Sequence, residues 1–425
     1  MPEEARRGLL KNRSYLDYLG MNVSSSAATQ VGSLAVIWYV FAVTKSPLDV
    51  ALVGGAQAVA TLAFSLPAGV WVDRHDRRRL LLVSNSIRAA CLALLSVTAA
   101  AFGLSLILIV ALVCVWNGAT ELYRSTDYSV LPDLVAPGEV ANANGVTRSG
   151  YMLASSASGL AGGALVAFLG AAFAFGVGAV GYGVAAAFSG MLFLRLRPTR
   201  AREGDQPRKR MWSEARDGFR WLWTQKGLFE LSVSAAVFNF LSAMPGYFIV
   251  VYVSVALKAG AFTFGAVLAA YVIGRAAGSL LVGKTGALAH AGKVWILLYA
   301  GATGAFILVQ GLFPSAAVAV ASNLVMGVGT GFAGNVWLTS AQHLVPSPMR
   351  GRYFAVDGLL SFVGGPPAVV VGGLLVASVG VLPVYVGVGV LLLASGVVFA
   401  AMKDLWALDG RPVPSREGSI PAISQ

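Results

Sequence analysis

Charged residues are scarce in this sequence. Asp, Glu, Lys and Arg make up 12% of the 425 residues, and hydrophobic residues make up 57%. Soluble domains carry about 25% charged residues, and the mean hydropathy here is +0.73. A water-soluble globular fold is therefore excluded, and we expect an integral membrane protein.

Cysteine and histidine are also rare, with two and three copies. Cys91 and Cys114 lie in apolar runs, where free buried thiols are expected and no redox compartment is indicated. His75, His290 and His343 fall in predicted loops. Because no Ser-His-Asp set, Cys-His cluster or pair of catalytic carboxylates can be assembled, the sequence predicts no enzyme, no metal site and no cofactor.

The 31 basic and 19 acidic residues give a net charge of +12. In a soluble protein such an excess would suggest nucleic-acid binding. Here the basic residues lie mainly in short loops between apolar runs, so no nucleic-acid partner is expected.

The apolar runs predict an all-α integral membrane fold with twelve transmembrane helices, because about 20 apolar residues cross about 30 Å of hydrocarbon as a helix. The predicted spans are 14–44, 50–72, 79–100, 104–127, 139–169, 171–194, 229–256, 261–283, 294–313, 315–342, 353–379 and 381–402. An even number places both termini on one side. Since the Lys and Arg residues gather in the loops of that side, both termini are predicted to be cytoplasmic, in the cell membrane.

The one long hydrophilic segment divides the chain into four predicted parts. These are a six-helix half at 1–194, a linker at 195–228, a second six-helix half at 229–402 and a tail at 403–425. Within the linker, five apolar residues recur at helical spacing: Trp212, Ala215, Phe219, Leu222 and Trp223. They predict an amphipathic helix in the membrane interface, held by anionic lipid or used as a partner-binding site.

The two halves are internal repeats. Gly162-Gly163-Ala164-Leu165-Val166-Ala167, followed by Gly170, reappears as Gly372-Gly373-Leu374-Leu375-Val376-Ala377, followed by Gly380. The offset is 372 − 162 = 210 residues. It also places Gly283-Lys284 at the position of Asp73-Arg74, so the second copy keeps a cation and loses the carboxylate.

A cluster of charges follows the second span: Gly69-Val70-Trp71-Val72-Asp73-Arg74-His75-Asp76-Arg77-Arg78-Arg79. It resembles the signature loop between spans 2 and 3 of the major facilitator superfamily, except that Asp76 stands where the family usually has a second glycine. Segments 131–135, 141–145 and 348–352 resemble loops in the branch that contains macrolide and siderophore exporters.

This resemblance covers nearly the whole chain and implies two pseudo-symmetric six-helix halves with substrate bound between them near mid-membrane. It also implies a gating motif formed by Gly69, Asp73, Arg74, Arg77 and Arg78, in which Asp73 would hold the amino terminus of span 11.

Few polar residues lie inside the spans, where they usually face a cavity or a partner. The candidate substrate-cavity residues are Gln30, Gln57, Asn117, Asn239, Arg275 and Asn323. A mainly apolar cavity with sparse polar points suits amphiphilic or aromatic substrates. Interhelical hydrogen bonding without a ligand is the alternative for each residue.

Three residues are candidates for coupling transport to protons: Glu121, Arg148 and Asp357. Glu121 and Arg148 are predicted at comparable depths on neighbouring spans, so movement of the cation would change the charge of the acid. The alternative is a structural pair joining spans 4 and 5.

Three further patterns have two interpretations each. Gly278 to Thr285 matches a phosphate-binding loop and Gly176 to Gly181 matches a dinucleotide-binding fingerprint, but both lie in apolar spans, where close helix packing is the better explanation. Met244-Pro245-Gly246 predicts either a static kink or a bending point in span 7.

We therefore expect a secondary active transporter that exports a small amphiphilic molecule by alternating access, with protons as the candidate coupling ion. It would work as a monomer among membrane lipids. The alternative is a lipid-handling or receptor-like membrane protein on the same fold, without concentrative transport.

Overall fold

The computed structural model describes residues 9–101, 105–136, 139–195, 216, 218–282, 287–346, 349, 353, 356–360 and 364–410. Eleven helices in this part of the chain are long and apolar enough to cross a membrane. One of them, α5 (Val140–Arg195), is 56 residues long and is interrupted at Gly170, so it crosses twice. The predicted twelve-span, all-helical fold is therefore confirmed.

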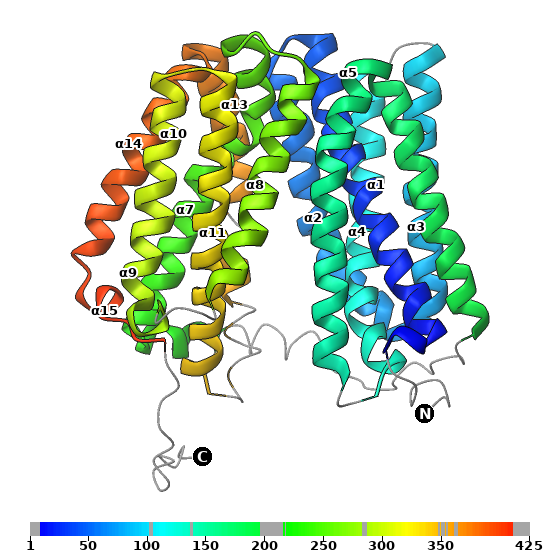
Figure 1. Cartoon of the computed structure of the whole chain (residues 1–425), viewed down its shortest axis with the longest axis horizontal. Helices are drawn as coiled ribbons and strands as arrows, with labels where there is room; N and C mark the ends of the chain where they lie inside the picture. The colour runs from blue at the N-terminus through cyan, green and yellow to red at the C-terminus, as the bar shows by residue number, and fades with distance from the viewer. Residues whose placement is uncertain are drawn as a thin grey trace, which may run out of the picture.

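The amino-terminal half contains α1 to α5 and the carboxy-terminal half contains α7 to α14 (Figure 1). The helices of the first half are α1 (Arg13–Thr44), α2 (Pro47–Arg74), α3 (Arg77–Ala101), α4 (Leu106–Leu134) and α5. Those of the second half are α7 (Lys226–Val251), α8 (Ala261–Leu281), α9 (Ala291–Trp295), α10 (Thr303–Leu312), α11 (Ala316–Leu344), α13 (Gly365–Val379) and α14 (Val381–Ala400), followed by the short α15 (Lys403–Trp406).

Two π-helical segments interrupt the second half. Tyr252–Ala256 continues α7, and Ile296–Ala302 joins α9 to α10 within a single span. We call the end of the molecule at which α1 begins the basal end, and the end at which α1 finishes the apical end. α15 lies at the basal end, the same end at which α1 begins (Figure 1).

Serine side chains fix three of the apical helix starts. Ser46, Ser105 and Ser315 accept hydrogen bonds from backbone N–H groups three residues later, at the starts of α2, α4 and α11. Such caps satisfy amides that the first turn of a helix leaves free. At its other end α4 continues to Leu134, beyond the predicted limit at residue 127, because hydropathy does not detect a helix that extends into water.

The internal repeat is visible in the backbone. α4 and α11 begin and end 210 residues apart, as 316 − 106 and 344 − 134 show. Gly170 has φ 84° and ψ 164°, and its counterpart Gly380 has φ 86° and ψ 168°. Side chains disfavour this region strongly, so both repeats use glycine for the same apical turn.

Hydrophobic clusters show how the two halves meet. One cluster contains residues of both halves, among them Phe41 of α1, Phe248 of α7 and Phe264 of α8. The basal ends instead have separate clusters. One lies around Tyr15 and Leu192 in the amino-terminal half, and the other lies around Trp295 and Leu405 in the carboxy-terminal half. Among the described residues, the halves therefore share a core toward the apical end and part toward the basal end.

The apical contact is made by very small residues. A Cβ atom added to Gly163 of α5 would lie 2.6 Å from the Cα atom of Gly265 of α8. Gly373 of α13 packs equally closely on Ala51 of α2. Backbones can approach this closely only where side chains are missing, so the repeated Gly-Gly pairs position the halves against each other.

Helix packing also accounts for the two motifs that match soluble proteins by chance. Gly278 of α8 lies directly against the backbone carbonyl of Val328 in α11, and Gly178 of α5 lies against Leu92 of α3. Pro245 lies inside α7, where its carbonyl oxygen accepts a 3.1 Å hydrogen bond from the Tyr385 hydroxyl.

The end of the linker is helical over residues 218–224. Leu222 is fully buried in the basal cluster of the carboxy-terminal half, while Phe219 and Trp223 are 41% and 62% exposed. The predicted apolar residues of this helix therefore divide between a protein contact and an exposed aromatic pair. Trp212 and Ala215 lie outside the described residues.

Candidate functional site

The charged turn between α2 and α3 is short and is built around Asp76. α2 ends at Arg74 and α3 begins at Arg77. The Asp76 carboxylate accepts a 3.0 Å hydrogen bond from the backbone N–H of Arg78, which caps α3. The residue that replaces the expected glycine thus keeps the turn tight by capping the next helix.

Asp76 also forms an ion pair with Arg78. The guanidinium donates to both carboxylate oxygens, with Nη2 2.6 Å from Oδ2 and Nε 3.0 Å from Oδ1. These hydrogen bonds from Arg78 hold the pKa of Asp76 below its usual value, although partial burial acts against them. Arg78 further donates to the carbonyl of Phe193, so it ties this turn to the end of α5.

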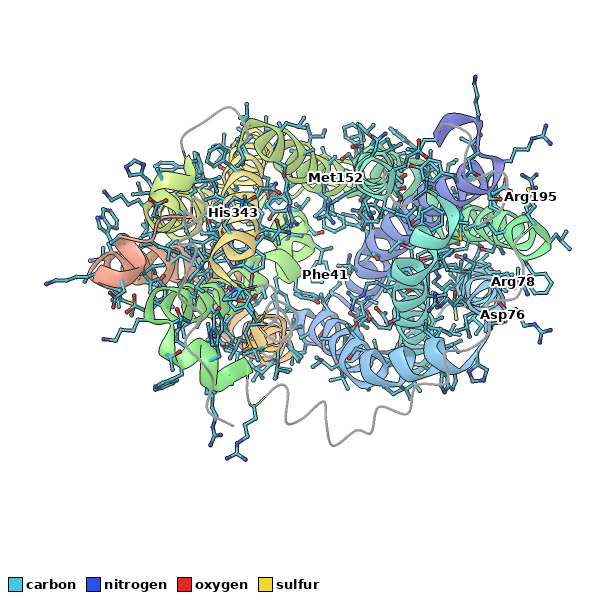
Figure 2. All side chains as sticks on the ribbon, turned by 90° about the horizontal axis from the view of Figure 1, so that it is seen from below. Phe41, Asp76, Arg78, Met152, Arg195 and His343 are labelled. Atoms are coloured by element: carbon cyan, nitrogen blue, oxygen red, sulfur yellow. The ribbon has the colours of Figure 1, made fainter. Side chains whose placement is uncertain are left out.

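This ion pair lies on the side of the amino-terminal half that is remote from the other half (Figure 2). Arg77 of the predicted gating motif is half-buried at the start of α3. The side chains of Gly69, Asp73 and Arg74 lie outside the described part of the structure, and so does the predicted contact of Asp73 with the start of span 11.

One of the predicted cavity residues, Gln30, lies in the region between the halves. Phe41 of α1 and Met152 of α5 face the space between the halves (Figure 2). Gln30 of α1 accepts a hydrogen bond from Ser155 of α5 at 3.4 Å, and it lies beside Gly159, close to the crossing of α5 with α8. The structure therefore places Gln30 at the contact between the halves.

The other predicted cavity residues fall into two groups. Asn117 donates to the carbonyl of Val113 in its own helix, and the buried Asn323 donates to Gln310 at 3.2 Å. Gln57 and Asn239 are half-buried, Arg275 is exposed, and in the described part of the chain these three side chains make no hydrogen bond or ion pair. The second group thus has polar atoms free for a solute or water.

The predicted coupling residues do not meet one another. Glu121 is buried and pairs with Arg124 at 2.6 Å rather than with Arg148. Arg148 is exposed on α5. Asp357 is buried and accepts a 2.7 Å hydrogen bond from Ser232 of α7.

The structure adds a polar network inside the amino-terminal half that the sequence analysis missed. Arg88 of α3 is 1% exposed and lies between two aromatic rings, with its Cζ atom 4.0 Å from the Tyr123 ring centroid and 4.6 Å from that of Tyr182. It also donates to Asn85. Arg88 is the only charged residue between Leu80 and Gly103, and this isolated charge in an apolar run was the one feature of the sequence that could have indicated the network.

The network continues to the basal end of α4. The Tyr123 hydroxyl donates to Asn22 of α1 at 3.2 Å, and the amide of Asn22 donates to Asp127 at 3.0 Å. Tyr18 also lies close to Asp127. Side chains of four spans are joined in this way to one acid and one cation.

Two six-helix halves that share a core at one end and part at the other have the architecture of a major facilitator transporter. The nucleoside transporter NupG is similar, with a TM-score of 0.74, 13% identity, and 92% of this chain and 100% of that chain covered. A bacterial homologue of the iron transporter ferroportin, in an inward-facing state, is similar with a TM-score of 0.71 and 16% identity, and the match covers 93% of this chain and 100% of that chain. A bacterial homologue of the human lysosomal transporter Spinster, in an inward-facing and unoccupied conformation, is similar with a TM-score of 0.66 and 15% identity, and the match covers 95% of this chain and 98% of that chain.

A family model described as transmembrane secretion effector matches residues 18–416. The chain therefore belongs to this family and is a membrane transporter of the major facilitator type. No curated protein sequence matches it.

Proposed function

We propose that this transporter exports a small amphiphilic solute by alternating access and that protons drive the export. The observation that carries the proposal is the arrangement of the cores: one is shared by both halves, and two are separate at the basal ends. Rocking the halves about the shared region would close the basal end and expose the site apically.

The lining chemistry supports an amphiphilic substrate. Gln57 and Asn239 have partly buried amides without a partner among the described residues, and Arg275 has a cation, all within helices made mostly of apolar residues. A few oriented polar groups in an apolar surround bind molecules that have both kinds of surface. Sugars and small ions would need many more polar contacts.

The direction of insertion follows from the basic residues. In the sequence they gather before α1, after α2 and in the linker, whereas Lys45 and Lys258 are the basic residues of the opposite loops. By the positive-inside bias we propose that the basal end is cytoplasmic, in the cell membrane. The protein would work as a monomer surrounded by lipid, with no nucleic acid, metal or cofactor involved.

Reconstitution tests this function. Purified protein in liposomes should move an amphiphilic aromatic dye such as ethidium saturably, and an imposed pH difference should accelerate the movement. Asn239→Leu should raise the dye concentration needed for half-maximal transport, whereas Asn144→Leu, at an exposed basal position of α5, should leave it unchanged. Dye binding without gradient-driven movement would instead favour the lipid-handling or receptor-like alternative.

A further inference from the structure

The buried arginine has an unusual environment for a charge inside a membrane protein. Its neighbours are the Asn85 oxygen and the faces of Tyr123 and Tyr182, and its Nε atom has no hydrogen-bond partner. Within the described residues it makes no ion pair at contact distance. Charges inside spans are costly and usually mark functional sites, so Arg88 needs a reason beyond packing.

Asp127 is connected to Arg88 through two intervening side chains. Arg88 lies over the Tyr123 ring, the Tyr123 hydroxyl donates to Asn22, and the Asn22 amide donates to Asp127. Asp127 ends the apolar part of α4 at the basal end, and it is only partly buried. The carboxylate is therefore more accessible than the guanidinium, which is 1% exposed and enclosed among α1, α3, α4 and α5.

The second half of the chain shows that the fold itself does not require these groups. At the offset of 210 residues, Arg88 corresponds to Leu298, Tyr123 to Ala333, Asp127 to Trp337 and Tyr182 to Leu392. Ala333 and Leu392 are fully buried in apolar clusters. The same helix arrangement is thus built in the second half with uncharged residues at all four of these positions.

We propose that Asp127 is a proton-binding site of the amino-terminal half and that Arg88 is its fixed countercharge. The carboxylate binds one proton from the basal solution, and the acid returns that proton when the carboxylate forms again. With Asp127 neutral, the buried guanidinium has no countercharge, so arrangements that hydrate it or bring another acid near it are favoured. The role of this site in driving transport rests on the proton coupling proposed above.

The surrounding groups are consistent with this assignment. Tyr18 from α1, Tyr123 from α4 and Tyr182 from α5 are the titratable groups that line the network together with Arg88 from α3. The nearby charges are engaged elsewhere, because Glu121 pairs with Arg124 and Asp17 pairs with Arg195 at 3.2 Å. Arg124 is 49% exposed, so Glu121 has a solvated partner that Asp127 lacks.

Infrared difference spectra of the purified protein between acidic and alkaline pH test the site with the proton itself as the probe. The wild type should show a carboxylic acid band that disappears in Asp127→Asn, moves in Arg88→Leu and persists in the matched control Glu121→Gln. A spectrum of Asp127→Asn identical to that of the wild type overturns the proposal.

Thermal unfolding of the same variants tests the pairing. Asp127→Asn leaves the buried cation uncompensated, so it should be less stable than the double variant Arg88→Leu/Asp127→Asn, in which both charges are gone. If the stability losses of Asp127→Asn and Arg88→Leu simply add in the double variant, the countercharge role of Arg88 is overturned.

Ethidium transport in liposomes with and without a pH difference then separates the two proposals. Loss of the gradient response in Asp127→Asn, with the response kept in Glu121→Gln, supports Asp127 as the coupling site, and the reverse pattern overturns this role. If the pH difference does not change the rate of ethidium transport by the wild type, the proposal that protons drive transport is wrong. The infrared band still decides whether Asp127 binds a proton.

Discussion

Replacing Asp76 by alanine should weaken the folded state by removing two interactions at once. A lost helix cap costs about 1 kcal/mol. Arg78, whose side chain is 9% exposed, would keep a charge without its partner, which adds about 1 to 3 kcal/mol. We therefore expect the free energy of unfolding to fall by about 2 to 4 kcal/mol.

Reversible unfolding in mixed micelles with increasing denaturing detergent measures this loss. Arg79→Gln is the matched control, because Arg79 is exposed in the same turn and makes no ion pair in the described part of the chain. Its effect should stay within about 0.5 kcal/mol. The double variant Asp76→Ala/Arg78→Met should lose less than the two single changes together, since both remove the same interaction.

The pH dependence of the same measurement has a defined sign. The pKa of Asp76 is lowered in the folded protein. The stabilisation by its carboxylate is therefore fully present above the usual unfolded value of 3.8 and is lost as the pH falls through the lower folded value. The difference between wild type and Asp76→Asn should be constant near neutral pH and shrink in acid. A loss below about 0.5 kcal/mol for Asp76→Ala, or a difference that grows in acid, would refute the reasoning.

Three further predictions concern the gate and the apical turns. Gly163→Ala puts a methyl group 2.6 Å from Gly265, so the apical ends should separate, which spin-label distances across α5 and α8 would report. Asp73→Asn should abolish ethidium transport in liposomes while ethidium affinity in detergent changes little. Lys284→Gln, in the second copy of the motif, should have a milder effect on transport. Normal turnover of Asp73→Asn would contradict the gating role. Gly170→Ala should lower the free energy of unfolding by about 1 to 2 kcal/mol, because the φ of Gly170 is 84°. The control Gly183→Ala, inside a helix and with open space at its Cβ position, should lower it by no more than about 0.5 kcal/mol. Detergent-induced unfolding measures both.

The fold could be predicted from the sequence because the length of each apolar run is set by the membrane. The Gly-Gly pairs at 162 and 372 gave the repeat, and the structure shows why they recur, since they lie where the halves touch. Helix ends were less predictable. α4 runs on to Leu134 outside the apolar run, where Leu134 packs in the basal cluster and its carbonyl oxygen accepts a hydrogen bond from the distant Asn12.

The site was harder to predict because facing directions depend on packing. Glu121 and Arg124 are three residues apart on one helix, a spacing at which side chains meet, whereas the predicted partner was Arg148, at a comparable depth on the next span. Arg88 stood out in an apolar run, but its aromatic neighbours Tyr123 and Tyr182 come from other helices, 35 and 94 residues later in the chain, as 123 − 88 and 182 − 88 show. No local pattern connects them.

The glycine crossing of α5 and α8 also affects how fast the halves can move. Most protein contacts interlock side chains, and separating them requires each rotamer to be released and later ordered again. At Gly163 and Gly265 the touching surfaces are bare backbone, which has no rotamers to reset. The two helices can therefore move over each other at this crossing with little loss of side-chain entropy, which would make the proposed rocking of the two halves fast.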